Sequence, residues 1–268
     1  MSHPILYTDI ISPKLQVGMD ELMGFGAQQQ RKRKSRNMKM KLSTGLNSLD
    51  TMLDGGFRGG DLIVLTGRPA VGKTSLALQI ASFIAQEIPQ KICVFSMSES
   101  AEQLTHILAR QSGTDPNEME RSTLIYDAPM ETPKRIATKL SERNNIGFVI
   151  IDYLQLMTKE DSGMLRETDF VRVSGELRKI AEEFQVSILC TSALHKGRIN
   201  TALGVKHPRL YDCGKFENVA VLLSLYRNTD VVCGKESCAA EIAILKNCYG
   251  DTEVFSISLD DDTLKFAE

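Results

Sequence analysis

The chain has 268 residues, of which 42% are hydrophobic, and this size suits one large domain with a full core and some additional sequence at the ends. No apolar run approaches the ~20 residues that a membrane helix needs, and residues 1–20 lack the apolar core of a signal peptide, so we expect a cytoplasmic protein without a membrane segment. The net charge of −2 gives no sign of nucleic-acid binding by the molecule as a whole.

Residues 1–40 are interpreted as an N-terminal appendage, and the globular domain is expected at residues 41–268. Positions 9–22 suit a short helix, whereas positions 28–36 are polar and charged, as is typical of a linker. Within that linker lies the basic run 31–36. Solvated linker charge explains this run better than direct contact with DNA does.

Apolar runs of strand length recur through the rest of the chain. They are residues 62–66, 92–96, 123–126, 148–152, 187–192, 219–226, 241–246 and 253–258. The first five alternate with helical segments, and the clearest helix, at about residues 165–184, places Phe170, Val173 and Leu177 on one face. Continuous apolar strands between helices predict an α/β fold with a mainly parallel sheet and helices on both faces. The last runs lack helix-length spacers, so antiparallel hairpins are expected at the C-terminal end.

Residues 67–74 read Gly-Arg-Pro-Ala-Val-Gly-Lys-Thr and fit the phosphate-binding loop pattern G-x-x-x-x-G-K-[ST] at every fixed position. An apolar run leads into the loop and an amphipathic run follows it, a setting that favours phosphate binding over a plain glycine-rich turn. Gly67 and Gly72 let several backbone N–H groups face one phosphate. Lys73 is expected to reach the outer phosphates, and the Thr74 hydroxyl is expected to bind Mg²⁺. The residues expected to contact ATP are Gly67, Arg68, Pro69, Ala70, Val71, Gly72, Lys73, Thr74 and Ser75.

Two carboxylates complete the expected site. One apolar run ends in Asp152, and in phosphate-loop enzymes such a residue holds the Mg²⁺ water shell beside the hydroxyl of Thr74. Glu99 follows the run that would form the strand next to the first one. A carboxylate there can orient the water that attacks the γ-phosphate, because hydrolysis needs a base within hydrogen-bond reach of that water. Surface solvation is the alternative for Glu99. Catalytic roles are therefore assigned to Lys73, Glu99 and Asp152.

Several segments together resemble the C-terminal motor domain of DnaB-type replicative DNA helicases over roughly residues 42–268. These segments are Ser43–Asp50, Gly60–Ile63, Gly67–Thr74, Phe95-Ser96, Glu102–Leu104 and, most specifically, Ile150–Met157 with its Asp-Tyr-Leu-Gln-Leu sequence. The resemblance implies a RecA-like P-loop NTPase fold and subunits that form a six-membered ring. It also implies ATP and Mg²⁺ between neighbouring subunits, single-stranded DNA in the centre, and a loader or other replisome protein as a partner.

Three positions depart from the pattern of this family. Ser98 stands where the family usually places Glu, and Glu99 matches the second of two adjacent Glu residues in RadA- and KaiC-like proteins. Ala193 replaces the Gln that serves as the polar sensor of the γ-phosphate. Cys248 replaces the Arg that enters the neighbour's ATP site, and cysteine cannot supply that charge. Lys246, two residues earlier, remains as the trans-acting candidate.

The basic residues Lys196, Arg198, Lys206 and Arg209 follow a strand-like run at the place where RecA-like motors carry a DNA-gripping loop. They are therefore candidates for DNA binding, with a solvated surface loop as the alternative.

The sequence leaves two functions open. The resemblance implies an ATP-dependent helicase core acting on single-stranded DNA, whereas the three departures favour a weakened RecA/KaiC-like nucleotide-binding regulator or helicase accessory protein. A nucleotide kinase has little support, because no arginine-rich lid segment is found.

Overall fold

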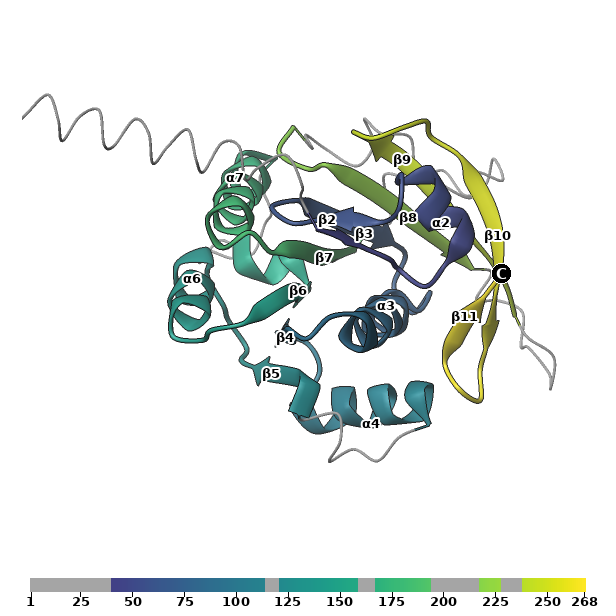
Figure 1. Ribbon diagram of the computed structural model, residues 1–268, viewed down its shortest axis with the longest axis horizontal. Coiled ribbons are helices and arrows are strands. Elements are labelled where there is room, and N and C mark those ends of the chain that lie inside the picture. The colour runs from purple at the N-terminus through teal and green to yellow at the C-terminus, as the bar shows by residue number, and fades with distance from the viewer. Residues whose placement is uncertain (1–39, 114–120, 159–166, 194–216, 228–237) are drawn as a thin grey trace, which may run out of the picture. The chain divides into compact units, whose positions relative to one another are not determined.

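The computed structural model describes residues 40–113, 121–158, 167–193, 217–227 and 238–268 (Figure 1). The expected N-terminal appendage therefore lies, apart from Met40, outside the described residues. Within the described ranges, no helix is long and apolar enough to cross a membrane.

The described residues form a nine-stranded sheet in the order β11-β10-β9-β8-β3-β7-β6-β4-β5. Its strands are β3 (Leu62–Gly67), β4 (Lys91–Ser96), β5 (Thr123–Asp127), β6 (Ile146–Asp152), β7 (Ser187–Ala193), β8 (Val221–Arg227), β9 (Cys238–Asn247), β10 (Val254–Asp260) and β11 (Lys265–Ala267). In this spatial order, the neighbouring strands β8, β3, β7, β6, β4 and β5 all pair in parallel. The neighbouring strands β8, β9, β10 and β11 all pair antiparallel. The prediction of a mainly parallel sheet with antiparallel C-terminal strands is confirmed.

Helices cover both faces of this sheet (Figure 1). One face carries α2 (Asn47–Met52), α3 (Lys73–Glu87) and α4 (Ala101–Ser112), and the other carries α6 (Pro133–Ser141), the 3₁₀ turn η1 (Leu154–Thr158) and α7 (Glu167–Phe184). A separate pair of short strands, β1 (Lys41–Leu42) and β2 (Phe57–Arg58), completes the described elements. Successive side chains of a strand point to opposite faces, so Ile63 and Leu65 of β3 join one hydrophobic core, and Leu62 and Val64 join the other.

Local sequence explains where the helices begin and end. The hydroxyl of Ser100 accepts a hydrogen bond from the backbone N–H of Gln103, whose side chain accepts one in return, and this capping box starts α4. The hydroxyl of Thr132 caps α6 by accepting a hydrogen bond from the backbone N–H of Arg135, with Pro133 at the first helical position. The described part of the long predicted helix runs from Glu167, and the helix ends at residue 184 as expected.

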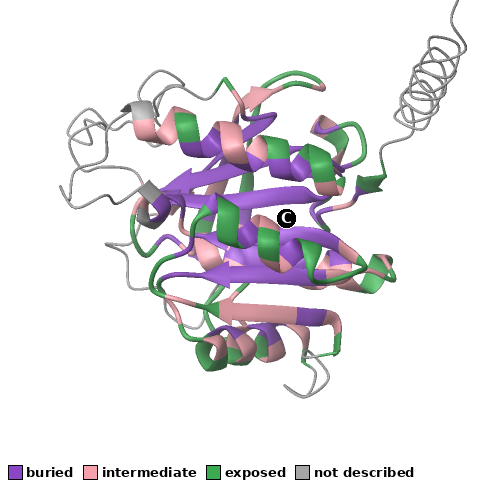
Figure 2. Ribbon diagram, turned by 90° about the vertical axis from the view of Figure 1, so that its left-hand side faces the viewer, coloured by how far each residue is buried: buried purple, intermediate pink, exposed green. Residues whose placement is uncertain are grey.

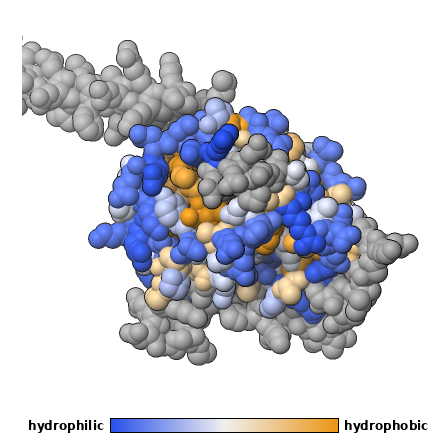
Figure 3. Space-filling model, turned by 90° about the horizontal axis from the view of Figure 1, so that it is seen from below, coloured by the Kyte–Doolittle hydropathy of each residue, from blue (hydrophilic) through white to orange (hydrophobic). Residues whose placement is uncertain are grey.

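Burial follows this arrangement. The central strands are buried along most of their length, whereas buried and exposed residues alternate along the helices (Figure 2). One face of the surface is mostly hydrophilic, with hydrophobic residues in smaller areas (Figure 3). The largest exposed apolar side chains among the described residues are those of Met40, Met130 and Val254.

Candidate functional site

The predicted phosphate loop joins the central strand β3 to helix α3. Strand β3 ends at Gly67, and α3 begins at Lys73, directly after Gly72. Gly72 has a φ of 100°, a left-handed conformation that L-residues with a side chain rarely adopt. At Gly67 a Cβ atom would lie 2.6 Å from the carbonyl oxygen of Leu225 in β8, so only glycine allows the two strands to approach this closely. The loop thus places the positive end of the α3 dipole beyond the carboxyl end of the sheet.

Lys73 lies over the phosphate loop. Its Nζ donates a hydrogen bond to the carbonyl oxygen of Arg68, at 2.8 Å. Burial lowers the pKa of the Lys73 ammonium, and the nearby carboxylate of Asp152 opposes this shift. The side chain is therefore positioned at the loop that the pattern predicts to hold phosphates.

Thr74 and Asp152 meet although 78 residues separate them in the sequence. The Thr74 hydroxyl donates to Asp152 Oδ2 at 2.8 Å, and the Thr191 hydroxyl donates to Asp152 Oδ1. Asp152 ends strand β6 and is 4% exposed. A hydroxyl beside a carboxylate is an oxygen donor pair of the kind that suits Mg²⁺, so these two residues fit the predicted metal-holding role.

The turn after β4 places Glu99 close to the end of β6, the strand that carries Asp152. The Ser96 hydroxyl donates to the Glu99 carbonyl oxygen at 2.7 Å and accepts from the Glu99 N–H at 3.0 Å. The backbone N–H of Met97 also donates to the carbonyl oxygen of Asp152, at 2.7 Å. Glu99 is half-buried, at the same edge of the sheet as the phosphate loop. Its role as the base remains a prediction.

A polar side chain that the sequence analysis did not assign occupies the end of β7. Gln155, from the Asp-Tyr-Leu-Gln-Leu segment, donates from Nε2 to the Ser192 hydroxyl at 2.7 Å and to the Ala193 carbonyl oxygen at 2.8 Å. The peptide bond between Asp152 and Tyr153, which leads into this turn, is cis. An amide group therefore lies at the strand end where Ala193 provides no polar side chain.

Arg227, at the end of β8, also contacts the phosphate loop. Its Nη2 donates to the carbonyl oxygen of Ala70 at 3.0 Å, and its Nη1 lies 3.3 Å from Asp261 Oδ1. Ala70 has a φ of 63°, which is uncommon for a residue other than glycine. The guanidinium thus ties the middle of the phosphate loop to the segment between β10 and β11.

Strands β10 and β11 with the intervening residues 261–264 form a C-terminal hairpin that approaches the phosphate loop. The Gln79 amide donates to the Phe266 carbonyl oxygen and accepts from the Phe266 N–H, both at 2.7 Å. The Phe266 ring lies 2.9 Å from the position that a Cβ atom of Gly72 would take. No local pattern in the sequence marks these contacts, because they join residues 187 positions apart.

Comparison with known proteins identifies the family. The model of the DnaB-like helicase C-terminal domain matches residues 41–143 and 117–268. The chain belongs to this family. The resemblance inferred from the motifs is thus confirmed, and so is the RecA-like P-loop class of the fold, because solved helicase and ATPase domains share it.

Individual relatives agree with this assignment. A probable replicative DNA helicase of Trieres chinensis is 30% identical, over 84% of this chain and 56% of that protein. The replicative DNA helicase DnaC of Bacillus subtilis (strain 168) is 30% identical, over 58% of this chain and 40% of that protein. This chain therefore spans about half the length of the curated relatives it matches.

Two solved structures have the same fold. A DnaB-like replicative helicase, described with its interactions with primase, aligns with a TM-score of 0.74 and 20% identity over 94% of this chain and 71% of that one. An ATPase domain aligns with a TM-score of 0.71 and 18% identity over 93% of this chain and 98% of that one.

Lys246, the trans-acting candidate of this DnaB-like domain, lies towards the amino end of the parallel strands, whereas the phosphate loop of its own chain lies at their carboxyl end. Lys246 pairs with Leu222 in β8, whereas Gly67 pairs with Leu225, three residues further along that strand. At about 3.3 Å per residue, the two positions are roughly 10 Å apart along the strand. Cys248 is an exposed free thiol, and its N–H donates to the Ala220 carbonyl oxygen. Neither residue is therefore placed to serve the phosphate loop of its own chain.

The four DNA-binding candidates, Lys196, Arg198, Lys206 and Arg209, lie outside the described residues. Strand β7, which precedes them, ends at Ala193 on the same edge of the sheet as Asp152.

Proposed function

We propose that this DnaB-like domain binds ATP with Mg²⁺ and hydrolyses it as one subunit of a ring helicase that moves along single-stranded DNA. The observation that supports this most is that Lys73 lies over the phosphate loop while the adjacent Thr74 hydroxyl donates to the Asp152 carboxylate. Family membership adds the expectation of helicase work. We further propose that residues 41–268 form the ATPase domain, that residues 1–40 form a separate appendage, and that the protein is cytoplasmic.

Each residue of the site has a definite task in this proposal. The backbone N–H groups of residues 67–75 hold the phosphates, and the ammonium of Lys73 balances charge that develops on the outer ones. Mg²⁺, held by Thr74 and through water by Asp152, would add positive charge at the same phosphates. The Glu99 carboxylate accepts the proton of the attacking water. Arg227 keeps the loop in the conformation that receives the phosphates.

The ring is part of the proposal because hydrolysis in phosphate-loop enzymes gains from a second positive group at the γ-phosphate. In this family the neighbouring subunit supplies that charge, and here Lys246 is the residue proposed to do so. Cys248 carries no charge at the usual position, and loss of such an arginine costs about 10³ or more in rate. Slow turnover is therefore expected even in an assembled ring. DNA contact through Lys196, Arg198, Lys206 and Arg209, and a loader or primase-type partner, complete the proposal.

A second function, a nucleotide-binding regulator or accessory protein of a helicase, is favoured by Ser98 and Cys248. Steady-state ATPase rates with and without single-stranded DNA, measured together with native mass, separate the two functions. A helicase core is expected to form oligomers and to hydrolyse ATP faster when DNA is present. A regulator would bind ATP without any response of the rate to DNA, and that outcome would reject the helicase proposal.

A further inference from the structure

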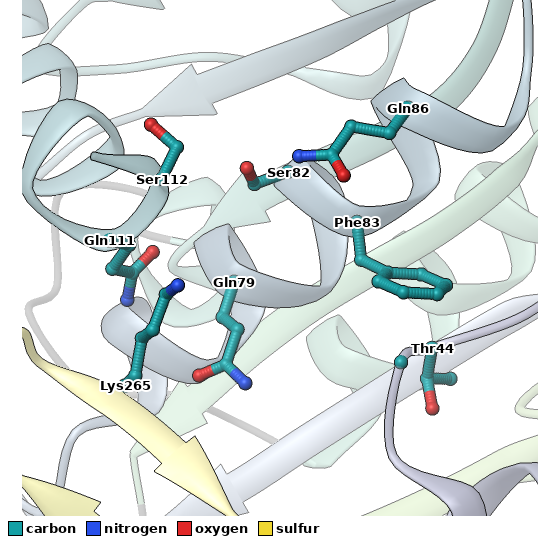
Figure 4. Close-up of a pocket in the computed structure, with 9 residues that line it drawn as sticks. Thr44, Gln79, Ser82, Phe83, Gln86, Gln111, Ser112 and Lys265 are labelled. Atoms are coloured by element: carbon teal, nitrogen blue, oxygen red, sulfur yellow. The ribbon is translucent and has the colours of Figure 1, made fainter. Parts of the chain in front are cut away.

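A pocket lies on the flank of α3, between α4, the C-terminal hairpin and residues 44–45, and its volume is about 350 Å³ (Figure 4). Side chains from three separate elements converge on it, among them Ser82, Gln111 and Lys265. No residue of the phosphate loop lines it, so it is distinct from the ATP site. Its volume falls in the range of about 300–1,000 Å³ that is common for small-molecule sites.

Gln111 gives this pocket a buried hydrogen-bond acceptor. The side-chain amide donates from Nε2 to the carbonyl oxygens of Ser75, at 2.9 Å, and Leu264, at 2.8 Å. Reversing the amide would set its oxygen against both carbonyl oxygens, so its orientation is fixed. Gln111 is 2% exposed, and its Oε1 is buried without a hydrogen-bond partner. A buried acceptor of this kind is stabilised by a ligand that brings an N–H donor.

The rest of the pocket wall defines the chemistry of the ligand. Lys265 is exposed and offers an ammonium group that pairs with an anion. The half-buried ring of Phe83 offers a flat apolar surface. We propose that this pocket binds a small planar molecule that carries an N–H donor and a phosphate group, such as a nucleoside monophosphate. The donor meets Gln111, the phosphate meets Lys265, and the planar ring packs on Phe83.

The pocket is connected to the phosphate loop by its own lining residues. Gln111 holds the carbonyl oxygen of Ser75, and Gln79, which also lines the pocket, holds both backbone groups of Phe266 beside Gly72. A ligand bonded to Gln111 orders these contacts, and the affinity for ATP then rises by about five-fold. This coupling to ATP affinity rests on the proposed function, whereas ligand binding in the pocket does not.

Binding is tested by calorimetry with AMP on the full chain carrying Lys73→Ala, which disables the phosphate loop. Purine riboside monophosphate, which has no N–H donor on its ring, and adenosine, which has no phosphate, serve as comparison ligands. AMP is expected to saturate one site and to bind at least ten-fold more tightly than either. Absence of saturable AMP binding, or equal affinity for AMP and purine riboside monophosphate, would overturn the proposal.

Variants locate the binding site. Ser82→Phe fills the pocket and Lys265→Gln removes its charge, and both are expected to weaken AMP binding at least ten-fold. The matched control Lys134→Gln, at an exposed position of α6, is expected to change nothing. Thermal unfolding verifies that each variant is folded. AMP binding that survives Ser82→Phe in a folded protein would place the ligand elsewhere and refute the assignment.

Coupling is tested by the ATP affinity of the wild-type chain with and without saturating AMP. Coupling through the pocket raises the affinity for ATP, whereas competition at the phosphate loop lowers it. Ser82→Phe is expected to abolish the AMP-dependent rise in ATP affinity and nothing else. If AMP binds in the pocket and ATP affinity falls or stays constant, the coupling is wrong. If the wild-type chain binds no ATP either with or without AMP, the proposed function is wrong, while the pocket assignment stands on the AMP data.

Discussion

Replacing Arg227 with Met should loosen the phosphate loop without emptying the space that the side chain fills. The substitution removes the 3.0 Å hydrogen bond from Nη2 to the Ala70 carbonyl oxygen and the 3.3 Å ion pair with Asp261. A hydrogen bond from a charged group contributes about 1.5–3 kcal/mol. The Asp261 carboxylate is 46% exposed, so the ion pair adds at most about 1 kcal/mol. If about 1.5 kcal/mol is needed to reorder the loop on binding, affinity for ATP falls roughly ten-fold.

The assay is ATP titration by calorimetry together with thermal unfolding, and the chain offers a matched control. Arg178 in α7 also makes two ion pairs, with Asp61 at 3.4 Å and Glu182 at 3.1 Å, but it packs on the opposite face of the sheet. Arg178→Met should lower the unfolding temperature and leave ATP affinity unchanged. Unchanged ATP affinity in folded Arg227→Met would show that the loop keeps its binding conformation without the hydrogen bond to Ala70. The positioning role of Arg227 would then be refuted.

Three further predictions concern turnover and thiol chemistry. Glu99→Gln should lower the ATPase rate at least ten-fold while sparing ATP affinity, and equal rates would exclude Glu99 as the base. Cys248→Arg should raise DNA-stimulated turnover in assembled protein alone, and a gain in monomers would contradict action on a neighbour's site. Burial raises the pKa of the Cys93 thiol to about 12 and raises that of Cys190 as well, so at pH 8 both stay protonated. Iodoacetamide followed by mass spectrometry should therefore label exposed Cys248 before either, and early labelling of Cys93 would contradict its burial.

The sequence predicted those parts of the site that depend on contiguous residues. The glycine pattern, Lys73 and Thr74 lie within one short segment, and Asp152 ends a run whose apolar character already marks a buried strand. Strand–helix alternation also gave the parallel sheet, because each unit of that alternation is local.

Contacts between distant segments could not be predicted in this way. Arg227 meets Ala70 across 157 residues, and Gln111 meets Leu264 across 153. Neither residue carries a local pattern, because each is positioned by strand order and by the path of the C-terminal hairpin. Gln155 is different: it was part of the family segment, but only the register of β6 against β7 brings its amide to Ser192.

Calorimetric titration of Mg·ATP into the wild-type chain and into Lys73→Ala decides whether the phosphate loop of this DnaB-like domain binds ATP through Lys73. We expect saturable binding by the wild type and loss of most of the affinity in the variant, with thermal unfolding verifying that both proteins are folded. Wild-type affinity in Lys73→Ala, or no ATP binding by the folded wild-type chain, would contradict it.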